Sequence, residues 1–404
     1  MNFKKIGIVM LAVTICILCA CGHSTDRRNK DAAQAIAALQ KGDFELARRA
    51  VNDVLMKDKD NHYARLVSAV VNYKDAMHQL ALLVYSREYK DSDLPRLLKK
   101  SEEGLRLVDV DLEKAAHPDI ELELCMACWQ YDWNHNGRID DRDQKLFEIE
   151  VDAQGAEIPE GDPRRKPTFH FDEGDVLWAR AMVSFQRAVL DILLAYDLNS
   201  LFKPNQPQPS NPSIWLQIHL IEPQRIAQAR ARILEGQDYA EKARRLYLAE
   251  TDDDREWVPN PKQKNHPLPL PVDQQLYDTW QRILQDVQKL VKGNEGLSVA
   301  EIAQLGDHKW QTPPKGFINI SKMLDKPKDI IIGNEAVEHI LAANHSNEEN
   351  PTEAEAALKD ILGEYYVPEM KPSPLLKEFI HIKSEIDRHE EPLERKLRYL
   401  LWLN

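Results

Sequence analysis

Apolar residues recur at intervals of three and four along most of the chain, which is the spacing of one face of an α-helix. The pattern predicts a helical hairpin and its continuation over residues 31–89, broken at Lys41-Gly42-Asp43, and a helix over residues 94–108 with a short turn after it. Over residues 172–198 the apolar positions cover more than one stripe, so this helix is expected at the centre of the protein. Further helices are predicted over residues 223–250, 273–291, from 298, 352–366 and 375–403.

The spacing of apolar residues differs in the segment from Ile120 to Trp129. Its apolar side chains alternate with other residues, which is the two-residue period of a half-buried strand. This strand is expected to lead into a polar loop at Asp132, and a helix with Phe147 and Ile149 is expected after the loop. Two more short strands are predicted within residues 317–332. The predicted fold class is therefore mainly α, an irregular helical array with few short strands.

Composition supports this fold class and narrows the partners. The chain has 404 residues, enough for two or three domains, and its 15 Gly and 23 Pro favour helices joined by proline-bearing connectors. Its formal net charge is −13, and no stretch of the sequence concentrates basic residues. Because binding to nucleic-acid phosphates needs a basic face, we expect no nucleic-acid partner.

The first 21 residues have the features of an export signal. Lys4 and Lys5 precede an apolar run of about a dozen residues, which is short for a membrane span. The run ends in Leu18-Cys19-Ala20-Cys21, which resembles the lipobox of bacterial lipoproteins. The resemblance implies lipidation of Cys21, cleavage before it and a membrane anchor with several acyl chains. An ordinary signal peptide or a short membrane anchor is the alternative.

The residue after Cys21 bears on the location. It is Gly22, whereas Asp at this place would imply retention at the inner membrane of a Gram-negative cell. The resemblance to lipoproteins therefore implies a protein of the cell envelope, on the outer membrane and facing the periplasm if the cell is Gram-negative. Residues 22–30 are polar and are expected to form a tether.

The first predicted hairpin resembles a tetratricopeptide repeat. The matching residues are Ala35, Gly42, Asp43, Phe44, Ala47, Leu55 and Asp58, and Ala69 follows Ala35 at the 34-residue period. Lys59 departs from the pattern, which usually has Pro there, and the next unit lacks the Gly-Asp turn. Because roughly three repeats are needed for a stable array, the hairpin is expected to pack against later helices. An unrelated hairpin of similar composition is the alternative.

The stretch from Asp132 to Asp143 has oxygen-bearing side chains at the spacing of a calcium loop and resembles an EF-hand. The resemblance implies side-chain oxygens from Asp132, Asn134 and Asn136, a backbone carbonyl from Arg138, and carboxylates from Asp140 and Asp143, around a sharp turn at Gly137. Two features depart from the family pattern, because Asp143 stands where Glu is usual and a strand is predicted where a helix normally enters. An Asx-rich turn before a helix is the alternative.

We expect one Ca²⁺ ion with a structural role. The loop has three carboxylates and two amides for the ion, which suggests a dissociation constant on the order of 10⁻⁴ to 10⁻³ M. Calcium sensors use paired loops to open a groove, and the sequence contains one such loop. Calcium-controlled binding of a partner is the alternative.

Cys125 and Cys128 have the spacing of a redox pair or of half a zinc site. A zinc site needs four ligands, and the chain has no second cysteine pair outside the signal. On a regular strand the two side chains would point to opposite faces. Three interpretations stay open: ordinary packing, a disulfide formed where the strand bends, and redox chemistry.

Five segments are predicted: the signal (1–21), the tether (22–30), a helical domain similar to tetratricopeptide repeats (31–117), the calcium segment (118–151) and a helical body (152–404). The sequence predicts a calcium-binding, lipid-anchored envelope protein that acts as a non-catalytic scaffold or assembly factor for protein partners. One alternative is an envelope hydrolase of peptidoglycan or polysaccharide that uses carboxylates such as Asp172, Glu173 and Asp175. The other is a solute-binding lipoprotein, which would require a deep apolar pocket.

Overall fold

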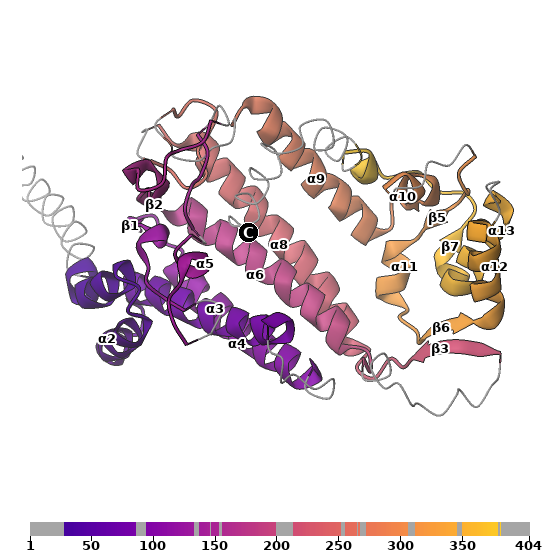
Figure 1. Cartoon of the computed structure of the whole chain (residues 1–404), viewed down its shortest axis with the longest axis horizontal. Coiled ribbons are helices and arrows are strands. Elements are labelled where there is room, and N and C mark those ends of the chain that lie inside the picture. Colours follow the sequence, from indigo (N-terminus) through magenta and orange to yellow (C-terminus); the bar gives the residue numbers. More distant parts are fainter. Residues whose placement is uncertain are drawn as a thin grey trace, which may run out of the picture.

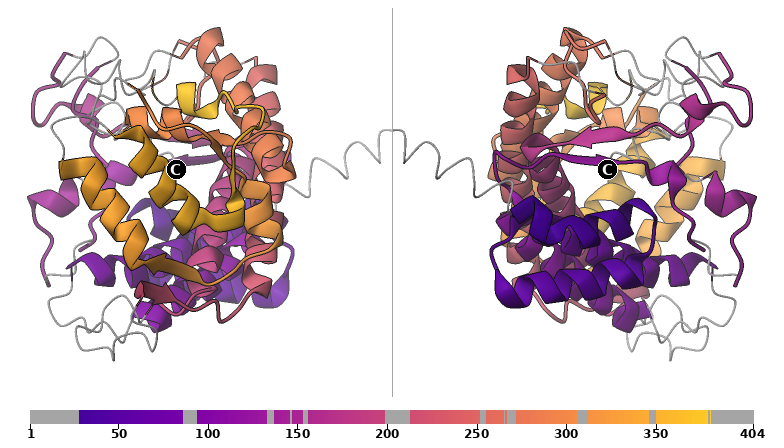
Figure 2. Two further views of the ribbon diagram at one scale, coloured as in Figure 1. Left: turned by 90° about the vertical axis from the view of Figure 1, so that its right-hand side faces the viewer. Right: turned by 90° about the vertical axis from the view of Figure 1, so that its left-hand side faces the viewer.

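A computed structural model describes residues 28–380 of the chain. Nothing is described of residues 86–93, 133–136, 146, 153–155, 199–212, 252–254, 265, 267–271, 306–311, 346–349 and 379, which lie within that range. Helices dominate the described part, as the periodicity predicted, and the strands are short. The N-terminal helices lie at one end of an elongated molecule and the C-terminal elements at the other (Figures 1 and 2).

Three helices and a preceding helical segment form the N-terminal end. Residues 28–40 are helical and form a hairpin with α2 (Phe44–Lys57), which α3 (His62–Tyr85) and α4 (Leu94–Ala115) follow. Gly42 makes the turn with a φ of +71°, a conformation that a residue with a Cβ resists, and an added Cβ would lie 3.1 Å from Trp129 Cβ. The Asp43 carboxylate caps α2 by accepting the Leu46 N–H at 2.9 Å.

The expected helical hairpin is therefore present, and its small residues are buried between the helices. Ala35 and Ala47 have no exposed surface, and Phe44 is 3% exposed. Membership of the hairpin in the tetratricopeptide-repeat family stays a prediction. Helix α4 continues to Ala115 without the interruption predicted after residue 108.

The centre of the molecule consists of α6 (Glu173–Leu194) and α8 (Gln224–Ala249), which run antiparallel, with α9 (Gln274–Lys292) returning along α8 (Figure 1). Helix α6 begins with a capping box, in which the Asp172 side chain accepts the Asp175 N–H and the Asp175 side chain accepts the Asp172 N–H. Gly174 permits close packing, because an added Cβ would lie 2.8 Å from the Tyr247 ring. The expected central helix is thus confirmed.

The C-terminal end combines short strands and helices. Strand β3 (Ile214–Ile218) pairs antiparallel with β6 (Ile330–Gly333), and β4 (Leu297–Ser298), β5 (Phe317–Ile318) and β7 (Tyr366–Val367) form a second antiparallel sheet. The helices between and beside these strands are α10 (Val299–Leu305), α11 (Ile320–Asp325), α12 (Asn334–His345), α13 (Pro351–Leu362) and the 3-10 turn η4 (Gly363–Tyr365). The two strands predicted within residues 317–332 correspond to β5 and β6.

The segment between α4 and α6 is mostly irregular. Strand β1 (Leu122–Leu124) pairs antiparallel with β2 (Phe169–Phe171), and between them lie α5 (Asp141–Gln144) and the 3-10 turns η2 (Met126–Cys128) and η3 (Pro163–Arg165). Two predictions were wrong here. The strand ends at Leu124 instead of residue 129, because the chain turns at η2.

The second error concerns the helix expected after the loop, which ends at Gln144. Residue 147 lies in a turn and residues 148–151 are outside any helix, and the Ile149 N–H bonds to the Arg165 carbonyl at 2.9 Å. This non-helical course places Ile149 and Val151 in a small core with Phe169 and Trp257. Burial in that core outweighs the helical spacing of the sequence.

The main hydrophobic core extends from Ala32 to Leu194 and joins the N-terminal helices to α6. It therefore crosses the predicted segment ends at residues 117 and 151. Among the described residues, no helix combines the length and the apolar character that a membrane span requires. Cys21 and the tether up to residue 27 lie outside the described residues.

Candidate functional site

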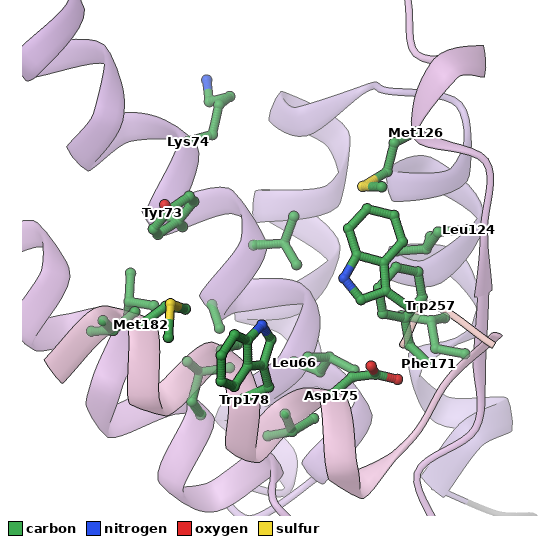
Figure 3. A pocket seen from close by; sticks show the side chains of 18 of the residues that line it. Leu66, Tyr73, Lys74, Leu124, Met126, Phe171, Asp175, Trp178, Met182 and Trp257 are labelled. Atoms are coloured by element: carbon green, nitrogen blue, oxygen red, sulfur yellow. The ribbon is translucent and has the colours of Figure 1, made fainter. Parts of the chain in front are cut away.

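An apolar pocket of about 420 Å³ lies between α3, α4, α6 and the irregular segment that contains β1 and β2 (Figure 3). Leu66, Ala69, Val70 and Tyr73 of α3 form one wall, at the spacing of one helix face. Figure 3 shows Trp178 and Met182 of α6 at the lower side and Leu124, Met126 and Trp257 at the right. A pocket of this size and character is typical of small-molecule sites.

Aromatic rings from the irregular segment close one side of the pocket. Trp129 packs edge-on against Phe44 at a centroid distance of 5.3 Å and against Phe147 at 5.8 Å, and all three line the pocket. Phe171 and Trp257 form a second pair at 5.3 Å. Large rigid side chains therefore keep the wall in place although little regular secondary structure supports it.

Asp175 is one of the few polar side chains in the lining. It is 6% exposed, its Oδ1 accepts the Tyr247 hydroxyl at 2.9 Å, and its Oδ2 accepts the Asp172 N–H at 2.9 Å. Burial, and next the negative charge of Asp172, raise the pKa of Asp175 well above its ordinary value. The ionised form of this carboxyl is therefore disfavoured, and both of its oxygens have internal partners.

Lys74 and Tyr73 lie on the side of the pocket away from Asp175 (Figure 3). The Tyr73 hydroxyl accepts the Gln186 side-chain N–H at 2.8 Å. The Lys74 side chain is 10% exposed, and its Nζ donates to the Tyr131 hydroxyl at 3.0 Å. Burial lowers the pKa of Lys74, but hydrogen bonds to Tyr131 and Asp75 raise it more, so the pKa lies above its ordinary value and the ammonium stays charged.

Cys125 and Cys128 form a disulfide, with Cα atoms 5.3 Å apart. The turn η2 brings them together, which a regular strand would not allow. Of the three interpretations that the sequence left open, the structure has the disulfide. The bridged turn carries Met126, and Trp129 follows it, so the disulfide fixes a part of the chain that lines the pocket.

The structure describes four of the six predicted calcium ligands. Asp132, Arg138, Asp140 and Asp143 are described, whereas Asn134 and Asn136 lie outside the described residues. Gly137 has a φ of +86°, and its N–H donates to Asp132 Oδ2 at 2.8 Å. Asp143 is 3% exposed, and its Oδ2 accepts the Asp140 N–H at 2.9 Å.

These contacts suit the EF-hand pattern, since Gly137 makes the left-handed turn and Asp132 is turned into the loop. Over the described ranges, however, no three His, Cys, Asp or Glu side chains are grouped to hold a metal ion. Asp132, Asp140 and Asp143 thus form no such group by themselves. A calcium site at this loop stays a prediction that also depends on Asn134 and Asn136.

The carboxylates considered for a hydrolase have structural contacts. Asp172 and Asp175 form the capping box of α6, and Asp175 also accepts the Tyr247 hydroxyl. Burial raises the pKa of Glu173, the residue between them. Helix initiation therefore accounts for the Asp172 and Asp175 side chains.

The pocket itself was missed at the sequence level. Its lining residues come from positions 44 to 257, and each segment has an ordinary core pattern. An excess of aromatic residues in the irregular stretch from Trp129 to Phe171 was the available signal. Comparisons with protein-family models, with curated proteins and with solved structures found no match to this chain.

Proposed function

We propose that the protein is an exported, lipid-anchored protein of the cell envelope that binds an apolar ligand in the pocket between α3, α4 and α6. The observation that carries the proposal is the pocket of about 420 Å³ with an almost wholly apolar lining. Burial of apolar ligand surface contributes about 25 cal/mol per Å² to the free energy of binding. A lipidated Cys21 would hold this binding site at the membrane, where apolar molecules are concentrated.

The test is titration with a neutral fluorescent apolar probe, N-phenyl-1-naphthylamine. Ala179→Phe places a ring in the pocket and is expected to weaken probe binding at least tenfold. Val189→Phe is the matched control, since Val189 lies on the same helix and is 56% exposed. Equal probe binding by Ala179→Phe and the wild type would contradict the proposal, provided that both melt at the same temperature.

We also propose that the loop from Asp132 to Asp143 binds one structural Ca²⁺ ion. The left-handed turn at Gly137 and the inward Asp132 support this, and the ion would link Tyr131 and Phe147, which flank the loop. Chelation is expected to lower the melting temperature of the protein, and Asp132→Ala to abolish that change. Asp141→Ala is the control, because Asp141 is exposed in the same loop and lies outside the ligand pattern. A melting temperature that does not depend on calcium would refute the site.

Binding of protein partners in the envelope is the second candidate function. The strand pair β3–β6 supports it, because Trp215 is 59% and Ile331 is 41% exposed. Trp215→Ser is expected to reduce the capture of envelope proteins by immobilised protein, with Met56→Ser, at another exposed apolar residue, as the control. Capture that is equal for both variants would count against a role of this strand pair.

A further inference from the structure

We propose that the pocket takes a single-chain amphiphile with an anionic headgroup, whose head pairs with the Lys74 ammonium and whose alkyl chain fills the apolar space. This inference rests on the proposed function and names the class of ligand.

Lys74 is the basic side chain in the lining of the pocket. Nine-tenths of its side chain is buried, and its Nζ lies 4.6 Å from the centre of the Tyr131 ring and 5.2 Å from that of Phe44. Burial of an ammonium is costly unless an anion or hydrogen bonds compensate it. In the described part of the chain, Tyr131 and the Asp75 carboxylate, 3.0 Å away, are its hydrogen-bonding partners.

Asp75 is a partner that a ligand can replace. Its side chain is 48% exposed and also pairs with Arg48, whose guanidinium contacts Asp75 Oδ2. An incoming anion that takes over Lys74 therefore leaves Asp75 with Arg48 and with water. Since Asp75 is exposed, the Lys74 side of the pocket also lies near solvent, where a charged headgroup keeps part of its hydration.

The opposite side of the pocket does not offer an ionised partner. Asp175 has two internal hydrogen bonds, and its charged form is disfavoured by burial. A cationic headgroup would therefore lack a carboxylate there, although aromatic rings surround the space. The charge on offer to a ligand is positive and lies at one end, which is the arrangement that an anionic amphiphile requires.

Figure 3 shows the Lys74 nitrogen directed away from Tyr73, Met182 and Trp178, with Asp175 at the far side of the pocket. A headgroup at Lys74 would thus place an alkyl chain along the row of Tyr73, Met182 and Trp178. The volume of about 420 Å³ suits on the order of a dozen methylenes, because each is about the size of a water molecule with its share of roughly 30 Å³. A twelve-carbon chain is therefore the appropriate probe.

The experiment measures displacement of the neutral fluorescent probe from the full-length mature protein by four twelve-carbon compounds. Dodecanoate and dodecyl phosphate carry an anionic head, methyl dodecanoate a neutral one, and dodecyltrimethylammonium a cationic one. We expect at least one anion to bind about tenfold more tightly than the ester, and the tighter anion identifies a fatty acid or a phosphate monoester as the source. Equal affinity of the anions and the ester, or tighter binding of the cation, would overturn the inference.

Variants of Lys74 locate the effect. Lys74→Met keeps the alkyl stem and is expected to abolish the preference for anions while neutral-probe binding persists, whereas Lys74→Arg should retain the preference. Lys242→Met is the matched control, because Lys242 also lies near a tyrosine ring and pairs with a neighbouring aspartate, on a helix that contributes no residue to the pocket lining. An unchanged anion preference in Lys74→Met would refute the role of Lys74.

The two proposals fail in distinguishable ways. If the wild-type protein binds neither the neutral probe nor any twelve-carbon compound, the proposed function itself is wrong. If the neutral probe binds but the anions bind no more tightly than the ester, the proposed apolar binding site is supported and the proposed ligand class is wrong. The comparison of acid with ester on the wild type decides this even if Lys74→Met does not fold.

Discussion

One stripe of α6 meets contrasting surroundings in its N-terminal and C-terminal halves. Val176, Ala179 and Val183 line the apolar pocket, whereas Arg187 and Asp191 belong to a buried network of ion pairs with α4 and α8. The apolar half leaves space beside the helix, whereas Arg187 and Asp191 in the charged half both have charged partners. The difference shows how one helix can border a pocket and still be fixed in position.

The ion pairs account for that fixed position. Arg187 contacts Glu102 at 3.1 Å and Asp109 at 3.0 Å on α4, while Asp191, with no exposed surface, contacts Arg225 at 2.9 Å and Arg232 at 2.6 Å. Buried charges require partners at defined positions, whereas apolar contacts are not directional. The network therefore sets the relative placement of α4, α6 and α8 without requiring that the pocket be filled.

The largest expected effect comes from breaking the ion pairs in the charged half of the stripe. Asp191→Ala removes the fully buried carboxylate that Arg225 and Arg232 share, so that each arginine keeps one partner, Glu222 and Glu102 respectively. It is expected to lower the free energy of unfolding by about 3 kcal/mol, the low end of the range for a broken buried ion pair. Asp238→Ala removes an exposed pair with Lys242 and should change it by less than about 1 kcal/mol. Denaturant unfolding measures both. A small loss in Asp191→Ala would mean that the network does not hold the helices.

The next effect concerns Glu250, the residue that follows the last residue of α8. Burial, and next the charges of Asp172 and Glu256, raise the pKa of Glu250 to about 9. The folded state then binds a proton that the unfolded state releases above its ordinary pKa of 4.5. Stability from this group is present at low pH and is lost as pH rises from about 5 to 9.

Glu250→Gln keeps the shape and the contact with Gln263, so this part of the pH dependence should disappear. Denaturant unfolding at several pH values between 5 and 9 measures it. A wild-type stability that increases over this range, or a slope unchanged in Glu250→Gln, would show that the buried carboxyl is not protonated.

The smallest expected effect on stability comes from the wall of the pocket. Reduction of the Cys125–Cys128 disulfide opens a short loop, which on chain-entropy grounds costs about 2 kcal/mol of stability. Because Met126 and Trp129 line the pocket, probe affinity should also fall. A double Cys→Ser variant is the control for the reductant. Probe binding that is unaffected by loss of the disulfide would separate this turn from the pocket.

Local sequence features predicted the elements that depend on neighbouring residues. The helix spacing located α6, α8 and α9, and the turn chemistry of Gly42 and Asp43 located the first hairpin. The spacing from Asp132 to Asp143 located the left-handed turn at Gly137. These features are set by backbone sterics and by hydrogen bonds within a few residues, so they can be inferred from the chain alone.

Only the tertiary structure decided the features that join distant residues. The pairing of Asp191 with Arg232, the bend that brings Cys125 to Cys128, and the non-helical course of Ile149 each depend on packing against other segments. The pocket depends on such packing most of all, since an apolar stripe that borders a pocket has the same sequence pattern as one that is fully packed. Hydrophobic burial is not directional, so the sequence determined which faces of the helices are apolar, and only their assembly decided which apolar face borders the space that a ligand could fill.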